Sequence, residues 1–306
     1  MVERPPGVSA PPPRRPRSPR RVPRSVIYRR RLVGLGVAAA GFVVAWFAVG
    51  AVRGGGNEST TTTVVPPRPF LVVFPEGFTR EQITARIAAV ARIAERERGR
   101  RPRLSAGGYL TATGRRRSEA GFGTRRLPLE GFLFPATYEF TARTTSAQLV
   151  AAQLQAFRRT WTRVSLGYAR SKNLTPYDVL TIASMVEKEA VVPEERPLVA
   201  AVIYNRLREG MPLGIDATLR YGLGIPPTES IRRSQLESDS PYNTRRRLGL
   251  PPTPIANPGL ASIRAAAHPA RVDYLYFLRK PDKQHHFFTA SYRAFVNYEN
   301  AHGYNR

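Results

Sequence analysis

The chain has 306 residues, enough for one or two domains with cores of their own and a membrane anchor in addition. It contains no cysteine, which excludes disulfides, thiolate metal sites and cysteine nucleophiles. The formal net charge is +26, from 48 Lys+Arg against 22 Asp+Glu, so any charged partner should be anionic.

The N-terminal segments predict a single membrane anchor. Residues 1–31 are rich in proline and arginine with one acid, Glu3, and we expect this tail to be disordered. Residues 32–52 form an uncharged apolar run of bilayer-spanning length, longer than the apolar region of a signal peptide, which is the alternative. The arginines precede the run, so the N-terminus should be cytoplasmic and the rest outside the cell membrane. This topology makes nucleic acid an unlikely partner and favours anionic lipid or cell-wall polymer.

A small strand–helix unit is expected after the anchor. Residues 53–69 are a linker of glycine, threonine and proline. Residues 70–74 predict a short strand, and Thr79 with Gln82 three residues later predicts a capping box at the start of a helix. Residues 96–126 are interpreted as a helix end, a loop and a poorly defined connection.

From residue 129 the composition becomes that of a folded core. The elements expected there are helices at 146–164, 175–190 and 193–209, strands at 273–277 and 286–288, and a helix at 291–300. The fold class expected is therefore α+β.

The helix at 175–190 is the best candidate to carry chemistry. Thr175 followed by Pro176 is a strong helix start. Apolar residues surround most of the helix, which predicts burial, yet it ends in Glu187 and Glu189. Burial would raise the pKa of such a carboxyl and let it act as a general acid. The alternative is that both glutamates lie in a solvated last turn.

Four further polar residues are candidates, each with a structural alternative. Asp216 is either a second active-site carboxylate or a turn residue. Asn205 either hydrogen-bonds the catalytic carboxylate or is a satisfied core amide. Tyr242 and Asn243 could hold a sugar by stacking and by amide hydrogen bonds, whereas an asparagine there also suits an Asx turn.

The sequence indicates no metal site and no cofactor. The four histidines, His268, His285, His286 and His302, lack zinc spacing, and the adjacent pair would point apart on a strand.

The order of short motifs after residue 129 resembles the MltG (YceG-like) family of endolytic murein transglycosylases. The motifs include EGFLFPATY at 130–138, ASMVEKE at 183–189, VIYNRL at 202–207, SPYNT at 240–244 and GLPPTPIANPG at 249–259. Each motif alone is weak, but their fixed order is specific. The resemblance covers about residues 70–298 and is dense from 129 onward.

The resemblance implies that Glu189, the second glutamate of the Glu-x-Glu, is the catalytic acid. It would cleave the bond after N-acetylmuramic acid (MurNAc) in peptidoglycan glycan strands and leave 1,6-anhydro ends. Position on the helix does not by itself choose between Glu189 and Glu187, which stays a candidate for substrate binding. The family further implies a bacterial cell-membrane protein anchored by one helix, with cell-wall synthesis proteins as candidate partners.

Two departures from the family pattern affect the expected domains. The strand–helix unit, placed at 70–128, is shorter than the family's usual LysM-like subdomain, which puts glycan binding by that unit in question. The usual Asp-Pro-Thr is replaced by Asp-Ala-Thr at 216–218. The catalytic domain, of mixed α/β type, is expected at 129–306.

Three other functions compete with the lytic enzyme. The chain could be a non-catalytic murein-binding scaffold of the same fold, or a muramidase that hydrolyses with water. A nucleic-acid binder would fit the basic composition but not the predicted topology.

Overall fold

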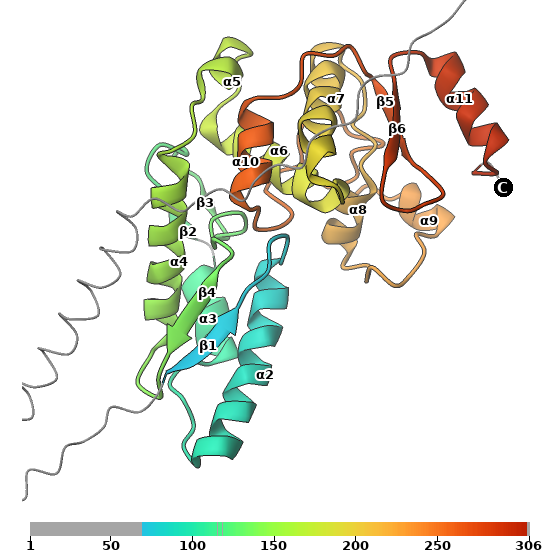
Figure 1. The fold of residues 1–306 in the computed structure, drawn as a ribbon. Helices are drawn as coiled ribbons and strands as arrows, with labels where there is room; N and C mark the ends of the chain where they lie inside the picture. The colour runs from blue at the N-terminus through green and yellow to red at the C-terminus, as the bar shows by residue number, and fades with distance from the viewer. Residues whose placement is uncertain (1–68, 115, 118, 305–306) are drawn as a thin grey trace, which may run out of the picture. The chain divides into compact units, whose positions relative to one another are not determined.

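A computed structural model of the chain describes residues 69–114, 116, 117 and 119–304 (Figure 1). Its elements are β1 (Phe70–Val73), α2 (Arg80–Arg98), α3 (Ala106–Thr113), β2 (Arg116–Arg117), β3 (Arg126–Leu127), β4 (Thr137–Phe140), α4 (Ser146–Trp161), α5 (Gly167–Ser171), α6 (Pro176–Glu189), the 3-10 helix η1 (Pro193–Glu195), α7 (Arg196–Arg208), α8 (Asp216–Leu223), α9 (Arg233–Leu236), α10 (Leu260–Ala267), β5 (Tyr276–Arg279), β6 (His286–Thr289) and α11 (Tyr292–Ala301).

The predicted tail at 1–31, the predicted anchor at 32–52 and nearly all of the linker at 53–69 lie outside the described residues. Within the part of the chain that is described, no helix combines the length and the apolar character needed to cross a bilayer.

The first folded unit is a β-α-α-β arrangement rather than the single strand–helix unit expected from the sequence. Strand β1 pairs antiparallel with β4, with Phe70 opposite Phe140 and Val73 opposite Thr137. Helices α2 and α3 lie between these strands in the chain and pack against each other, and α3 also packs against α4. Because β4 belongs to the segment expected as a separate domain at 129–306, the expected boundary after residue 128 divides one packed unit.

Helix α3 was missed because its sequence carries no apolar stripe and contains two glycines. Its start is nevertheless capped, since the Ser105 Oγ accepts the N–H of Gly108 at 3.2 Å. Tyr109 is fully buried and donates its hydroxyl to the Gln153 Oε1 at 2.7 Å. Tertiary contacts to α4 therefore stabilise a helix that local propensity disfavours.

The described residues form two hydrophobic cores, a first one between β1, β4 and α2–α4 and a second one between α6, α7 and α10. Most of helix α6 is buried in the second core, and the burial of this helix was predicted from its apolar residues. The Thr175 Oγ1 accepts the N–H of Asp178 at 3.2 Å, and the Asp178 Oδ2 accepts the N–H of Thr175 at 2.8 Å, which completes a capping box. Residues 179–186 are all buried. Helices α7, α8 and α10 pack around α6, so its apolar residues are covered on several sides.

The two cores share contacts through α6 and the loop at 249–259. Leu180 of α6 packs in the first core, whereas most of the apolar residues of this helix pack in the second. The Asn257 Oδ1 accepts the N–H groups of Gly131 and Leu133, both at 2.9 Å. The loop is thereby fixed to the first core by buried hydrogen bonds.

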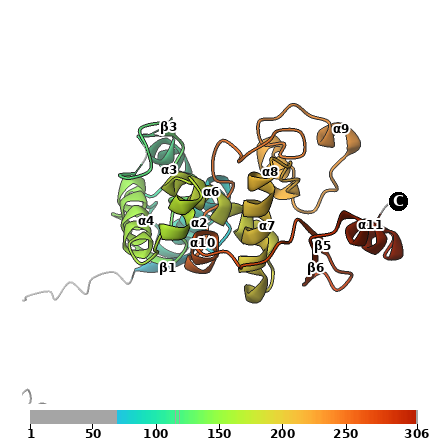
Figure 2. The same cartoon turned by 90° about the horizontal axis from the view of Figure 1, so that it is seen from above.

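A C-terminal hairpin lies next to α7. Strands β5 and β6 are antiparallel, with Arg279 opposite His286. The first strand begins at Tyr276, whereas the sequence predicted that it would begin at residue 273. In both views α7 lies between α6 and this hairpin, and it contacts both (Figure 2). The Arg279 Nη2 reaches the carbonyl oxygen of Glu189 at 3.5 Å, so the hairpin lies beside the C-terminal end of α6.

Candidate active site

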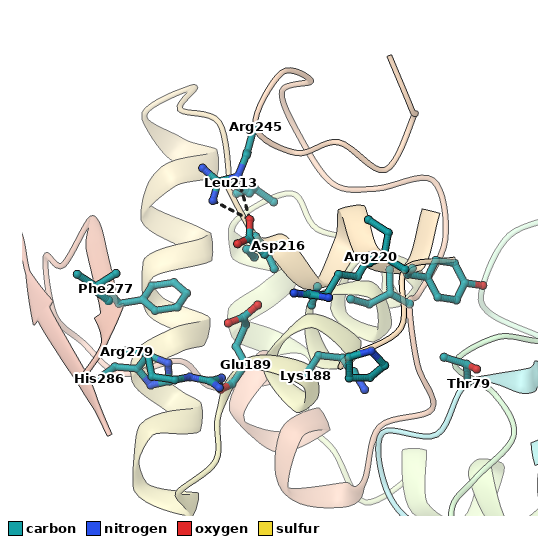
Figure 3. A pocket seen from close by; sticks show the side chains of 18 of the residues that line it. Thr79, Lys188, Glu189, Leu213, Asp216, Arg220, Arg245, Phe277, Arg279 and His286 are labelled. Carbon is teal, nitrogen blue, oxygen red and sulfur yellow. Dashed lines mark hydrogen bonds and ion pairs between the residues drawn. The ribbon is translucent and has the colours of Figure 1, made fainter. Parts of the chain in front are cut away.

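Glu189 is the last residue of α6, and its side chain lines a cleft of about 1020 Å³. The walls of the cleft are formed by residues of α2, α6, α7, α8, the hairpin β5–β6 and α11. Figure 3 shows the carboxyl group of Glu189 between Asp216 and Arg279. Glu189 is half-buried, so a substrate in the cleft can reach it.

Burial raises the pKa of Glu189 to about 7, because a low-dielectric surrounding disfavours the charged carboxylate. The positive charge of Arg279, the N–H of Ala217 and the positive charge of Lys188 act in the opposite direction, whereas the negative charge of Asp216 adds to the rise. A carboxyl with this pKa can donate a proton and take one back near neutral pH.

Glu130 is a second buried carboxyl whose pKa burial raises to about 7. It is 1% exposed, and its oxygens accept the N–H of Arg80, the amide of Asn257 and the hydroxyl of Tyr221 at 2.8–3.1 Å. Glu130 is absent from the lining of the cleft. We therefore assign it a structural role, joining α2, the 249–259 loop and α8, and keep Glu189 as the candidate acid.

Asp216 is the second carboxylate in the cleft. It is the first residue of α8, and its Oδ1 accepts both the Nε and the Nη2 of Arg245, at 2.9 and 2.6 Å. The helix cap is Ile215, so the turn-capping alternative for Asp216 does not describe its side chain. Glu189 and Asp216 are the two predicted site residues that the structure brings into one cleft.

Glu187 does not line this cleft. Its Oε2 accepts the N–H of Gly259, the residue that caps α10, at 3.0 Å. A carboxylate at this position also interacts favourably with the positive end of the helix. The two glutamates of the Glu-x-Glu therefore have different partners, and the Glu187 contact joins α6 to the start of α10.

The Asn205 amide does not make the predicted contact with Glu189. Its Nδ2 donates to the carbonyl oxygens of Val272 and Tyr274 at 2.8 and 2.9 Å, and its Oδ1 accepts from Arg208 at 3.1 Å. Asn205 is the satisfied amide of the structural alternative, connecting α7 to the segment before β5.

Tyr242 and Asn243 also lie outside the lining of the cleft. The Asn243 Nδ2 donates to the carbonyl oxygens of Leu236 and Ser238, and its Oδ1 accepts the N–H two residues later, which is the Asx turn of the structural alternative. The Tyr242 hydroxyl is 2.8 Å from the Thr253 Oγ1. Both residues fix loops, and sugar binding by them has no geometric support.

Sequence reasoning missed Arg279 and His286, which line the cleft on the hairpin. The carboxylate of Glu195 accepts the N–H and contacts the Nδ1 of His286, at 2.8 and 2.6 Å, and both side chains are buried. This pair holds the hairpin against η1 and so positions the cleft wall. No local pattern signals it, because the partners are 91 residues apart.

Among the described residues, no group of three histidine, aspartate or glutamate side chains is arranged to hold a metal ion.

The fold and the cleft together define an α+β protein with an open cleft, in which the carboxyl groups of Glu189 and Asp216 lie among several cationic side chains. The sequence model of the YceG-like family matches residues 55–301, and the chain belongs to this family. The expected YceG-like fold of mixed α/β content is thereby confirmed.

Solved and curated relatives agree with this assignment. The chain is 40% identical over 153 residues to an endolytic murein transglycosylase of Bacillus subtilis, covering 50% of this chain and 42% of the relative. It is 40% identical over 160 residues to one of Streptococcus pneumoniae R6, covering 50% and 28%. A crystal structure of a yceG-like protein of Listeria monocytogenes superposes with a TM-score of 0.61 at 29% identity, over 78% of each chain. The match spans less than half of the length of these curated relatives.

Proposed function

We propose that the chain is a membrane-anchored endolytic peptidoglycan transglycosylase. It cleaves the bond between MurNAc and N-acetylglucosamine (GlcNAc) in nascent glycan strands, leaves 1,6-anhydroMurNAc ends and so terminates strand elongation. The observation that carries the proposal is the half-buried Glu189, whose pKa burial raises to about 7, in a cleft of about 1020 Å³. The names of the curated relatives support the same reaction.

Glu189 performs both proton transfers in this mechanism. Its carboxyl donates a proton to the glycosidic oxygen, and the C1–O bond breaks with the electron pair going to the GlcNAc hydroxyl that leaves. The resulting carboxylate takes the proton from the C6 hydroxyl of the same MurNAc, whose oxygen bonds to C1. No water is consumed and Glu189 ends protonated, so a single carboxyl suffices, in contrast to glycosidases that need two.

Asp216 is proposed to stabilise the positive charge that develops at C1. Its carboxylate lines the same cleft and is held by Arg245, which donates two hydrogen bonds to the Oδ1. The N–H of Ala217, in the first turn of α8, favours the ionised form of Glu189 and therefore supports the state that accepts the second proton.

Product analysis of un-crosslinked glycan strands tests the reaction. The purified full chain should produce anhydro ends, and Glu189→Gln should lower their rate by at least about a hundredfold, the usual contribution of general acid–base catalysis. Glu187→Gln is the matched control, because its carboxylate caps α10 instead of facing the cleft. Release of reducing ends, one water heavier, would indicate a muramidase. Binding without any cleavage by the wild-type chain would indicate a scaffold.

We infer that residues 32–52 anchor the chain in the bacterial cell membrane with the N-terminus in the cytoplasm and the cleft outside. The uncharged length of the run and the arginines before it support this topology. Cell-wall synthesis proteins that release nascent strands at this surface are the candidate protein partners. A reporter enzyme that is active only outside the cytoplasm should be active when it is fused to the C-terminus. An inactive reporter in a stably expressed fusion would indicate the opposite orientation.

A further inference from the structure

The cleft around Glu189 carries more cationic than acidic side chains. The cations are Lys188, Arg206, Arg220, Arg245 and Arg279, and the acids are Glu81, Glu189, Asp216 and Glu299. When Glu189 holds the proton that the reaction requires, five positive charges face three negative ones. An uncharged saccharide would not complement this excess.

Two of these arginines are engaged in forming the wall. Arg245 is bound to Asp216, as described above. The half-buried Arg206 donates its Nε to the carbonyl oxygen of Leu275 at 2.6 Å and its Nη1 to that of Leu213 at 2.7 Å. Their hydrogen bonds hold β5 and α8 in place around the cleft.

The other three cations, Lys188, Arg220 and Arg279, form what we call the cationic rim. They come from three elements, α6, α8 and β5. Figure 3 shows Arg220 and Arg279 near Glu189, whereas the Lys188 side chain extends away from it and its Nζ is 3.4 Å from the carbonyl oxygen of Gly77. Arg279 is exposed, and its guanidinium is 3.5 Å from the carbonyl oxygen of Glu189, which is a weak contact. Arg220 is fixed through its Nη1, which donates to two carbonyl oxygens at 2.8 and 2.9 Å. A guanidinium has five N–H donors, so Arg279 in particular can bind an additional acceptor.

The substrate of the proposed function carries acids at one place. Its sugar rings are uncharged, and its carboxylates hang from the lactyl ether of MurNAc, either as the free lactyl group or on the stem peptide. We propose that the cationic rim is a carboxylate-binding subsite for these lactyl-linked acids, so that the enzyme prefers strands that carry them. This inference rests on the proposed function of the cleft. Arginine suits the role because its planar fork pairs with both oxygens of a carboxylate.

Arginine is abundant throughout the chain, so the composition alone could place cations in a cleft. The position of Arg279 argues for more than this, because it is the cation with the largest influence on Glu189 and its side chain is exposed at the reacting group. Arg170, exposed on α5 and absent from the lining of the cleft, provides a matched control for the loss of one surface arginine.

The test compares three forms of the same un-crosslinked strands with the full chain. The first form keeps its stem peptides, the second is stripped to free lactyl carboxylates, and the third is stripped and then amidated to be neutral. Wild type should have its lowest kcat/KM on the neutral form. Arg279→Gln should lower kcat/KM about tenfold on the charged form that the rim recognises, the loss expected for one charge-assisted hydrogen bond, and little on the neutral form. Arg170→Gln should change none of the three.

The pattern of loss identifies the acid. A loss confined to peptide-bearing strands assigns the rim to stem carboxylates, and a loss on stripped strands assigns it to the lactyl carboxylate. The inference is overturned if wild type cleaves all three forms equally, or if Arg279→Gln lowers kcat/KM equally on all of them. Absence of anhydro ends from every form would refute the proposed function instead, and binding of the three forms to Glu189→Gln would still report whether the rim discriminates.

Discussion

Two charged side chains of opposite sign flank the Glu189 carboxyl, so single substitutions should move its pKa in opposite directions. Because its pKa is about 7, about half of the molecules hold the proton of Glu189 at pH 7 and about a tenth at pH 8. With the ordinary value of 4.5, fewer than about one in a hundred would hold it at pH 7. We therefore expect kcat/KM to fall about tenfold per pH unit above about pH 7.

This fall is the alkaline limb of the pH profile of kcat/KM. Asp216→Asn should move the limb to lower pH, since the substitution removes the negative charge that raises the pKa of Glu189 and leaves Arg245 without its carboxylate partner. Arg279→Gln should move the limb to higher pH, since it removes the positive charge that lowers this pKa. Both side chains are partly exposed, so solvent screening limits each shift to about half a pH unit. The assay is the initial rate of anhydro-end formation across the pH range. A limb near pH 4.5, or shifts of the same sign for both variants, would refute the reasoning.

Three substitutions away from the reacting group should change stability. Glu187→Ala removes the acceptor for the N–H of Gly259 and should lower the free energy of unfolding by about 1 kcal/mol. The variant should have a lower Tm and still form anhydro ends, and a loss of activity at unchanged Tm would contradict this expectation. Asn257→Ala leaves two buried N–H groups without an acceptor and should cost about 3 kcal/mol in urea unfolding, whereas an unchanged midpoint would show that water replaces the amide. Gly131→Ala should lower the free energy of unfolding by at least about 2 kcal/mol, because Gly131 has a φ of +89° and an added Cβ would lie 2.7 Å from Pro254. Wild-type stability of this variant would show that the loop around Pro254 can move to accept the methyl group.

The central helix could be predicted from the sequence because its signals are local. Thr175 and Asp178 mark its start, and an apolar pattern over 179–186 indicates burial. Which of its two glutamates faces the cleft could not be derived in this way. The outcome depends on where α8 and α10 pack, and these helices are distant in the sequence, so the choice of Glu189 rested on family resemblance.

The predicted roles of the amides failed for a similar reason. Asn205 and Asn243 were plausible ligand-binding residues by type, yet both donate to backbone carbonyl oxygens. Asparagine side chains serve either purpose, and only the tertiary structure shows which acceptors are near. Arg279 was missed for the opposite reason, because in a chain with 48 Lys+Arg no single arginine stands out.

Helix α6 contributes residues to both cores, and this couples the thermal unfolding of the two cores. Leu180 packs in one core and its helical neighbours in the other, so neither core can lose its packing without exposing part of the same helix. We expect one cooperative calorimetric transition, with the slowest amide hydrogens of α2 and α6 exchanging together through global opening. The Glu189 carboxyl is thus carried by a helix that we expect to unfold only together with the rest of the folded unit.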